Sequence, residues 1–268
     1  MASLTVEPNP RVTAKVIHED DDLIVVSKPT RVVTQPGVGH EHDTLLNGLF
    51  ATHGTQLQRL GRDRDFGLVH RLDRETSGIL VVALSIPAYE GLREAFKKRE
   101  VRKYYLAACD KAPNDREGVI KRPIIEDETR KDRYTREVKA RVTRAGKPAV
   151  TAYRVLDEVE TKEALIEARA VTGRLHQVRV HLASIGAGIL GDTVYGPRRT
   201  SVASKRLALH ASRLGFTHPV TGEKLKLEAP LTKDFRTLLR RIGLRLPDEI
   251  ARDNAEPSPA DLETTDTE

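Results

Sequence analysis

The sequence predicts an α+β protein, because many strand-like segments alternate with only three or four helical ones. Residues 79–84 and 164–171 are short and rich in apolar or β-branched side chains, as buried strands are. Residues 175–185 instead place leucine, valine and isoleucine at the spacing of one helix face. The chain of 268 residues is long enough to bury a sizeable core, and it shows no internal repeat.

The composition indicates a cytoplasmic protein. Hydrophobic residues make up 38% of the chain and charged residues 31%, and no run approaches the roughly 18 apolar residues of a membrane span. The first residues lack the apolar core of a secretion signal. Cys109 is the single cysteine, which excludes an internal disulfide and suits a reducing compartment. Its apolar neighbours favour a core position over a nucleophile.

Charge is distributed unevenly along the chain. Residues 247–268 hold eight acidic residues and one basic residue, against 39 and 45 in the whole chain, so the rest carries a net charge of +13. We therefore expect one domain over residues 12–246, followed by a disordered acidic tail over 247–268. A strongly basic body suggests a polyanionic partner such as nucleic acid. With five Phe, six Tyr and no Trp, base stacking is not expected to dominate binding.

The N-terminal part is predicted to form a hairpin and a helix. Residues 15–19 and 23–27 read as two strands separated by an acidic turn. Asp43 or Thr44 can cap a short helix that carries four apolar residues and is closed by Gly54.

The rest of the chain is predicted to alternate between strands and helices. A helix follows Ser85 and Pro87. The many charges of residues 120–147 indicate short strands and a mobile basic hairpin suited to lie along phosphates. The remaining elements are strands at 101–109, 147–156 and 164–171, a helix at 175–185, a hairpin at 216–227 and a helix at 233–242.

Neither a metal nor a cofactor is expected. His40 and His42 share a loop, but two histidines without cysteine or a fitting carboxylate cluster make a weak metal site. No glycine-rich phosphate loop is present that would indicate a nucleotide.

One segment, residues 66–84, joins a group of polar residues to a buried strand. Asp73 lies in this group between Arg71 and Arg74, and Gly78 permits a tight backbone path into the strand. An aspartate in such a turn usually caps neighbouring amides, so the residue type alone does not indicate catalysis.

The string HRLDRETSG before an apolar strand resembles the catalytic motif of the RluA-type pseudouridine synthases. The resemblance extends over about residues 16–231 through three separated motifs in the same order. It implies that Asp73 is the catalytic residue. In the string K-x-Y-L-A it selects Tyr105 over Tyr104 as the active-site tyrosine, and in TGRLHQVRVHL it implies that Arg179 pairs with the catalytic aspartate.

Further polar side chains of the first and third motifs are expected to contact RNA: Arg71, Arg74, Arg174, His176 and Gln177. A target uridine has to leave its stack, and Arg71 or Arg74 is suited to fill the gap or hold a phosphate. Ala187 and Gly188 stand where this family has His-Pro, so the resemblance does not predict the local geometry of that loop.

The resemblance implies a mixed, largely antiparallel sheet in two halves, with flanking helices and a central catalytic cleft. It implies an isomerase that converts uridine to pseudouridine in ribosomal RNA or tRNA, without a cofactor. We expect the protein to be a monomer. Asp73 would attack ribose C1′ or abstract the 2′ proton, and the sequence does not choose between them. The alternatives are a catalytically inactive RNA-binding or ribosome-assembly factor and a hydrolytic enzyme that releases the base or cuts the chain.

Overall fold

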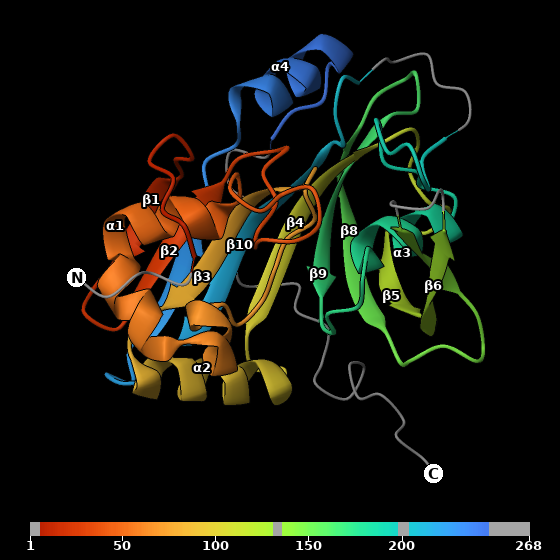
Figure 1. Cartoon of the computed structure of the whole chain (residues 1–268). Coiled ribbons are helices and arrows are strands. Elements are labelled where there is room, and N and C mark those ends of the chain that lie inside the picture. Colours follow the sequence, from red (N-terminus) through yellow and green to blue (C-terminus); the bar gives the residue numbers. More distant parts are fainter. Residues whose placement is uncertain (1–5, 131–135, 198–203, 247–268) are drawn as a thin grey trace. The chain divides into compact units, whose positions relative to one another are not determined.

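The computed structural model describes residues 6–130, 136–197 and 204–246, and its chain forms two compact units (Figure 1). Unit 1 joins Met1–Lys103 to His210–Thr232, and unit 2 joins Tyr104–Leu209 to the segment from Lys233 onward. The chain therefore passes from one unit to the other three times.

Unit 1 contains a mixed sheet whose strands follow the order β1-β2-β3-β10-β11. Its strands are β1 (Lys15–Glu19), β2 (Leu23–Lys28), β3 (Ser77–Ala83), β10 (Leu209–Thr217) and β11 (Lys224–Glu228). Pairing is antiparallel except between β3 and β10, which are parallel, with Ser77 opposite His210. β3 is buried along its whole length, which agrees with the continuous apolar run that predicted it.

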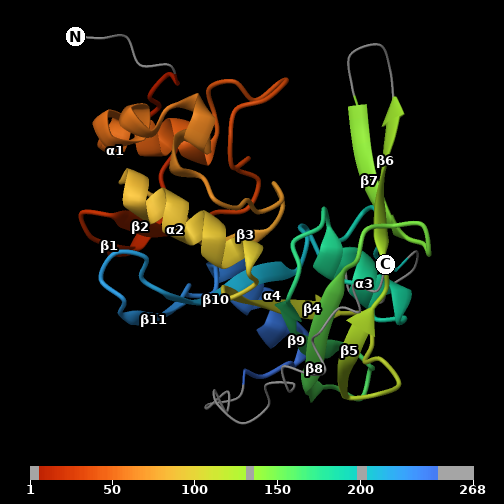
Figure 2. The same cartoon turned by 90° about the horizontal axis from the view of Figure 1, so that it is seen from below.

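Two helices, α1 (Leu45–Leu60) and α2 (Ile86–Lys97), lie on one side of this sheet (Figure 2). Thr44 caps α1 in a capping box with Asn47. The prediction that Gly54 ends this helix is wrong: the helix bends at His53 and continues to Leu60. Its apolar face continues beyond the glycine, and burial of that face outweighs the glycine's low helix propensity. A 3₁₀ segment, η1 (Arg62–Gly67), follows.

Unit 2 contains an antiparallel sheet in the order β4-β9-β8-β5. Its strands are β4 (Arg102–Cys109), β9 (Ala164–Ala170), β8 (Val150–Glu158) and β5 (Glu117–Lys121). β6 (Ile124–Arg130) and β7 (Arg136–Val142) form a separate two-stranded hairpin. The predicted hairpin therefore exists, although residues 131–135 lie outside the described residues. Its two strands hold four acidic and four basic residues, so they are not basic as predicted.

Unit 2 also holds two helices, α3 (Gln177–Ser184) and α4 (Lys233–Ile242). α3 is shorter than predicted because His176, at its N-cap, has a φ of 52°. The buried His181 ties α3 to the rest of the unit, since its Nδ1 lies 2.9 Å from the Thr151 hydroxyl and its Nε2 lies 2.8 Å from the Arg122 carbonyl oxygen.

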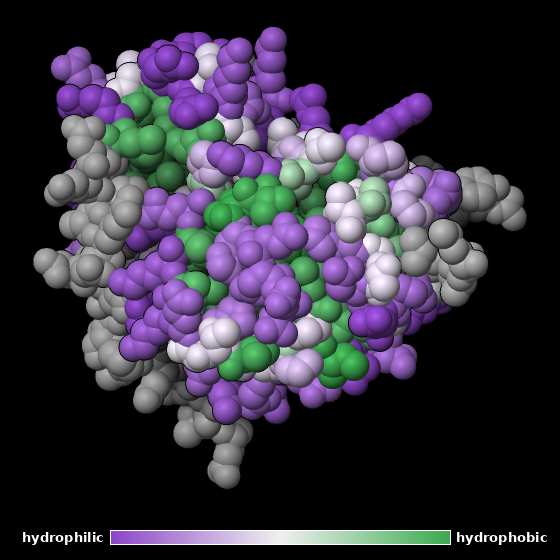
Figure 3. All heavy atoms as spheres, turned by 90° about the vertical axis from the view of Figure 1, so that its left-hand side faces the viewer, coloured by the Kyte–Doolittle hydropathy of each residue, from purple (hydrophilic) through white to green (hydrophobic). Residues whose placement is uncertain are grey.

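The structure thus confirms the predicted α+β class and a mainly antiparallel sheet with few helices. On the face shown in Figure 3, hydrophilic side chains predominate and apolar ones lie between them. Among the described residues, no helix has both the length and the apolar character needed to cross a membrane. The boundaries of the domain at 12–246 stay a prediction, and the acidic tail from Pro247 lies outside the described residues.

Candidate active site

Asp73 lies half-buried in the loop that leads into β3. Two hydroxyl groups fix the backbone on either side of it. The Thr34 hydroxyl donates to the Leu72 carbonyl oxygen (2.9 Å) and accepts from the Leu72 amide (3.3 Å), and the Thr30 hydroxyl donates to the Glu75 carbonyl oxygen (2.9 Å). These bonds hold the backbone of the Asp73 loop (residues 71–76) against the segment that follows β2.

Lys28 adds a third anchor from the end of β2. Its side chain is fully buried, and its Nζ donates to the carbonyl oxygens of Pro29 (2.9 Å), Val32 (2.7 Å) and Arg74 (3.3 Å). A buried ammonium group needs such acceptors because desolvation of an unpaired charge is costly. Lys28 therefore links the backbone after β2 to the residue next to Asp73.

His70 attaches the start of the motif to β3. Its Nε2 accepts the backbone N–H of Val81 (3.0 Å), and its ring stacks on Phe96 with centroids 4.9 Å apart. Burial lowers the pKa of His70 to about 3, and the charge of Lys103 acts in the same direction. Lys103 places its Nζ 5.5 Å from the Phe96 centroid, and burial lowers the pKa of this lysine to about 8.

Gly78 is required where β3 meets β10. Its φ is +118°, and a Cβ at this position would lie 2.1 Å from the carbonyl oxygen of Ala211. One residue earlier, the Ser77 hydroxyl lies 2.9 Å from Nδ1 of His210. The tight backbone path predicted for Gly78 is therefore confirmed, and its cause is the close approach of a parallel strand.

Arg71 and Arg74 flank Asp73 and are exposed. Arg74 makes a loose ion pair with the neighbouring Glu75 (3.9 Å), which contributes little at the surface. Within the described part of the chain, no carboxylate pairs with Arg71. Both guanidinium groups are thus positioned to meet an anion from solvent.

The third motif lies in unit 2, around the N-terminus of α3. Gln177 is buried there, and its amide makes four hydrogen bonds. Its Oε1 accepts from the Thr172 hydroxyl (2.6 Å) and the Arg174 amide (3.0 Å), and its Nε2 donates to the Val150 carbonyl oxygen (2.9 Å) and the Thr151 hydroxyl (3.0 Å). These bonds occupy the amide. Gln177 therefore supports the segment before α3 from inside unit 2, and its contact with RNA stays a prediction.

Arg179 makes a bidentate ion pair with Asp192 inside unit 2. Its Nε and one Nη donate to the two carboxylate oxygens at 2.8 and 2.9 Å, and both side chains are buried. Burial opposes ionisation of Asp192, but the hydrogen bond and charge of Arg179, with the amides of Tyr195 and Val194, hold the pKa of this carboxyl below its ordinary value. A guanidinium has five N–H donors, so the bonds to Asp192 do not exhaust Arg179.

Tyr195 connects Arg179 to the β6–β7 hairpin. Its ring centroid lies 5.1 Å from the Arg179 guanidinium carbon, and its hydroxyl accepts the backbone N–H of Ala140 on β7 (2.7 Å). The same hydroxyl lies 2.9 Å from Nδ1 of His176. Tyr195 thus joins the side chains of Arg179 and His176 to the backbone of β7.

The predicted site residues thus fall into two groups. Unit 1 holds Asp73 with Arg71 and Arg74 on one loop. Unit 2 holds the α3 group and Tyr105, which is half-buried on β4 opposite Ala168. In the α3 group Arg174 is half-buried, and its Nε donates to the Pro148 carbonyl oxygen (3.0 Å). The catalytic roles of Asp73, Tyr105 and Arg179 and the RNA contacts stay predictions.

Residues 22–184 match the model of a protein family described as RNA pseudouridylate synthase. This match covers more than half of the chain. The chain belongs to this family. The predicted membership among RluA-type enzymes is confirmed, and the protein is an RNA pseudouridine synthase, an isomerase that acts on RNA.

Similar proteins support the same conclusion. The synthase is 40% identical over 227 residues to an "uncharacterized RNA pseudouridine synthase", YlyB, of Bacillus subtilis, a match that covers 85% of this chain and 72% of the relative. It is 36% identical to "ribosomal large subunit pseudouridine synthase D" of Zymomonas mobilis, over 86% of this chain and 73% of the relative. The solved structure of human RNA pseudouridylate synthase domain containing 4 superposes with a TM-score of 0.67 at 29% identity, over 87% and 95% of the two chains.

One cluster in the synthase has the composition of a metal site. Asp20, Asp22 and His218 bring their ligand atoms within 4.8 Å of one another in unit 1. However, Nδ1 of His218 accepts the amides of Val220 (3.2 Å) and Thr221 (3.0 Å), so the neutral ring keeps its proton on Nε2, which lies 3.3 Å from Asp20. A protonated Nε2 does not bind a cation. The cluster instead links two turns of the synthase.

Four residues of the synthase that hold its site were not found from the sequence. Lys28 and Thr34 fix the Asp73 loop, and Asp192 and Tyr195 fix Arg179. For Lys28 the sequence does contain a signal, because a lysine at the end of an apolar strand indicates a buried charge. The other three are ordinary polar residues whose partners lie far away or in a turn, so sequence spacing does not indicate them.

Proposed function

We propose that this pseudouridine synthase isomerises uridines of large-subunit ribosomal RNA through the carboxylate of Asp73. The observation that carries the catalytic assignment is the construction of the Asp73 loop. Lys28, Thr30 and Thr34 fix its backbone, and the half-buried carboxylate sits at the start of a fully buried strand. A catalytic group has to be held close to its productive position, and side-chain anchors on the backbone provide this.

The reaction needs one ionised carboxylate near the sugar. The bond between C1′ and N1 breaks, the uracil rotates, and C1′ rejoins the base at C5, so the product has the mass of the substrate. Positive charge develops at C1′ as in glycosidases, where carboxylates stabilise it. Asp73 supplies this group either by attack at C1′ or by removing the 2′ proton, and both routes require its ionised form.

Arg179 and Tyr105 are proposed to complete the site. A guanidinium beside Asp73 would favour its ionised form, and Arg179 is suited to this because Asp192 already fixes its side chain. Tyr105 is proposed to stack on the base or to transfer a proton through its phenol. Arg71 and Arg74, both exposed, are proposed to hold the RNA backbone around the flipped uridine.

Ribosomal RNA as substrate is supported by the names of the similar enzymes, several of which are called ribosomal large subunit pseudouridine synthase D. The test is carbodiimide mapping of pseudouridine in total RNA after deletion of the gene. We expect signals to be lost from large-subunit ribosomal RNA. Loss from transfer RNA instead would contradict this part of the proposal. The monomeric state stays a prediction.

Asp73→Asn tests the catalytic assignment. The change keeps the shape of the side chain and removes its negative charge, so tritium release from RNA labelled at uridine C5 should fall to background while RNA affinity stays. Glu75→Gln is the matched control, because it makes the same change two residues later in the same loop and should retain turnover. Substantial turnover by Asp73→Asn would overturn the assignment. A wild-type protein inactive on all cellular RNA would favour the inactive RNA-binding factor.

A further inference from the structure

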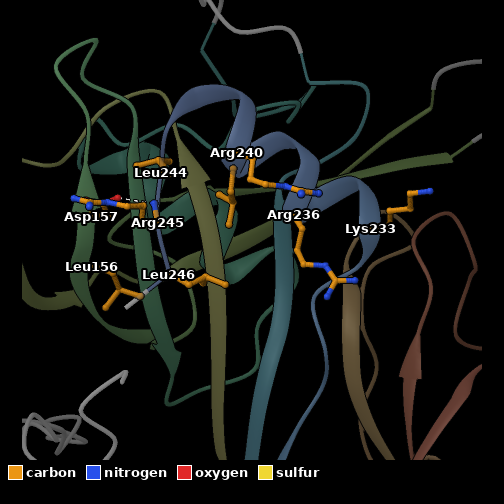
Figure 4. Close-up of a pocket in the computed structure, with 9 residues that line it drawn as sticks. Leu156, Asp157, Lys233, Arg236, Arg240, Leu244, Arg245 and Leu246 are labelled. Carbon is orange, nitrogen blue, oxygen red and sulfur yellow. Dashed lines mark hydrogen bonds between the residues drawn. The ribbon is translucent and has the colours of Figure 1, made fainter. Parts of the chain in front are cut away.

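A groove of about 820 Å³ lies in unit 2 between α4 and the end of β8 (Figure 4). One wall is Leu156 and Asp157 of β8, and the other is α4 with the segment that follows it. Four cationic side chains line this α4 groove: Lys233, Arg236, Arg240 and Arg245. Asp157 is the one acidic residue among the described lining, and its carboxylate accepts the backbone amide of Arg245 (2.6 Å). The lining is therefore strongly cationic.

The helix presents its cations on one face. Lys233, Arg236 and Arg240 are spaced three and four residues apart, so they follow one another along the helix over roughly 10 Å. All three are exposed, and Figure 4 shows them on the same helix, with Arg245 beside Asp157 at the other end of the groove. The opposite face of the helix is buried through Phe235, Leu238 and Leu239. The outer face of α4 is thus cationic as well as polar.

Apolar side chains also line the α4 groove. Leu244 is buried, whereas Leu246 leaves 39% of its surface exposed. Cations along a groove that also exposes apolar surface match the chemistry of a nucleotide chain, whose phosphates meet the cations while its bases or sugars cover the leucines. RNA is the macromolecule on which this enzyme acts. We propose that the α4 groove binds the RNA substrate through its phosphates, outside the reacting nucleotide.

The groove lies at a distance from α3. Gln177 of α3 bonds to Val150 and Thr151 at the start of β8, whereas the groove lies at Leu156, five residues later. At about 3.3 Å per residue this is roughly 17 Å. In a stacked, helical strand one nucleotide advances about 3.4 Å, so such a strand in contact with α3 needs about five more nucleotides to reach the groove. The groove therefore contributes to the binding of long RNA substrates and not to the binding of short ones.

The experiment compares neighbouring positions of one helix. Arg240→Gln removes a charge from the groove, and Arg241→Gln removes one next to it, from a side chain that is not part of the described lining. The double variant Arg236→Gln/Arg240→Gln gives the full effect. The probes are transcribed large-subunit ribosomal RNA and a uridine-containing oligonucleotide of about five nucleotides. Binding is titrated at several salt concentrations, and turnover is measured at saturating RNA.

We expect the double variant to bind the long RNA about 10- to 30-fold more weakly at 0.1 M salt, with a salt slope smaller by about 1.4 to 1.8, as for two lost phosphate contacts. Arg240→Gln should show about half of the slope change, while Arg241→Gln and binding of the short RNA should not change. Equal effects of Arg240→Gln and Arg241→Gln would overturn the inference. Unchanged or tighter binding of the long RNA by the double variant would also overturn the inference. It would indicate that another occupant, such as the acidic tail, covers the groove.

This inference rests on the proposed function only in its choice of ribosomal RNA as the long probe. If the wild-type enzyme binds this RNA but does not modify it, the proposed substrate is wrong, and the affinity comparison still decides whether the α4 groove binds RNA. If turnover occurs and the groove variants bind like wild type, the proposed function stands and the inference fails.

Discussion

The ammonium group of Lys28 donates a hydrogen bond to the carbonyl oxygen of Arg74, 46 residues later in the chain (Nζ to O, 3.3 Å). The same group donates to two carbonyl oxygens of its own segment and is fully buried. A single charged side chain therefore fixes the backbone on one side of Asp73, and the position of the carboxylate depends on a residue outside the polar motif.

Lys28→Met should lower both stability and turnover. The change keeps the length of the side chain but leaves three part-buried carbonyl oxygens without their donor. An unsatisfied group costs about 1–3 kcal/mol where it is buried. We expect the free energy of unfolding in urea to fall by about 3 kcal/mol or more. In the remaining folded enzyme, kcat should fall more than RNA affinity. Thr30→Val removes one bond to the same loop and should cost about 1 kcal/mol. Wild-type kcat in folded Lys28→Met would show that the loop does not need this anchor.

Arg179→Ala and Arg71→Ala should have opposite effects. Arg179 is fixed by Asp192 in a buried pair and is assigned to Asp73, so its loss should reduce turnover more than binding. Arg71 is exposed and assigned to phosphate, so its loss should weaken RNA binding and leave the rate at saturation nearly unchanged. Filter binding and single-turnover rates measure the two quantities. Equal losses of affinity with equal rates at saturation would contradict this division.

The stability of the protein should fall between pH 7 and pH 5, in part through His70. Burial lowers the pKa of His70 to about 3 in the folded protein, against an ordinary value of 6.5. Below pH 6.5 the imidazole of His70 therefore binds a proton in the unfolded chain but not in the folded chain. The free energy of unfolding then falls by up to 1.4 kcal/mol for each further pH unit, or by about 1–2 kcal/mol in total at pH 5. Burial also lowers the pKa of His181, so this residue adds to the same trend.

His70→Gln isolates the contribution of His70. The glutamine oxygen can accept the Val81 amide in place of Nε2 but does not titrate, so the loss of stability from pH 7 to pH 5 should shrink by about 1–2 kcal/mol. Urea unfolding at the two pH values measures it. The carboxyl of Asp192, whose pKa is lowered, loses its contribution only as the pH falls below about 4. An unchanged pH dependence in His70→Gln would rule out His70 as its source.

The acidic tail, residues 247–268, should weaken RNA binding. It lies outside the described residues, and it begins immediately after Leu246, which lines the α4 groove. An acidic segment of net charge −7 attached to a body of +13 competes with phosphate for the same cations. A chain that ends at Leu246 should bind an unrelated RNA more tightly, with less selectivity and a steeper salt slope. Superimposable titrations would show that the tail is inert, as screening beyond about 10 Å at 0.1 M salt would explain.

The elements of this fold could be predicted because each one follows from local patterns. The apolar runs of β2 and β3 and the Ser85 cap of α2 are properties of neighbouring residues. The end of α1 was predicted wrongly because a glycine signal competed with an apolar face that continues to Leu60. Burial decided the outcome, and burial depends on what the helix packs against.

The contacts of the site could not be predicted in the same way. Resemblance to a family indicated Asp73 and Arg179, but the partner of Arg179 inside unit 2, Asp192, is one of 39 acidic residues in the chain. The sequence also contained no sign that Gln177 is buried and that its amide holds the loop before α3. Polar residues in a motif are divided between substrate contact and internal support, and burial separates the two.

The parallel pairing of β3 with β10 also constrains how the protein is made. Ser77 and His210, which face each other across these strands, are 133 positions apart. A ribosome that adds about 5–20 residues per second needs roughly 7–27 seconds to cover this separation. During that time β3, the strand that follows the Asp73 loop, has an open edge, which is a site for wrong pairing with other chains. A nascent chain therefore acquires a fully supported Asp73 only after Tyr104–Leu209 of unit 2 have been synthesised.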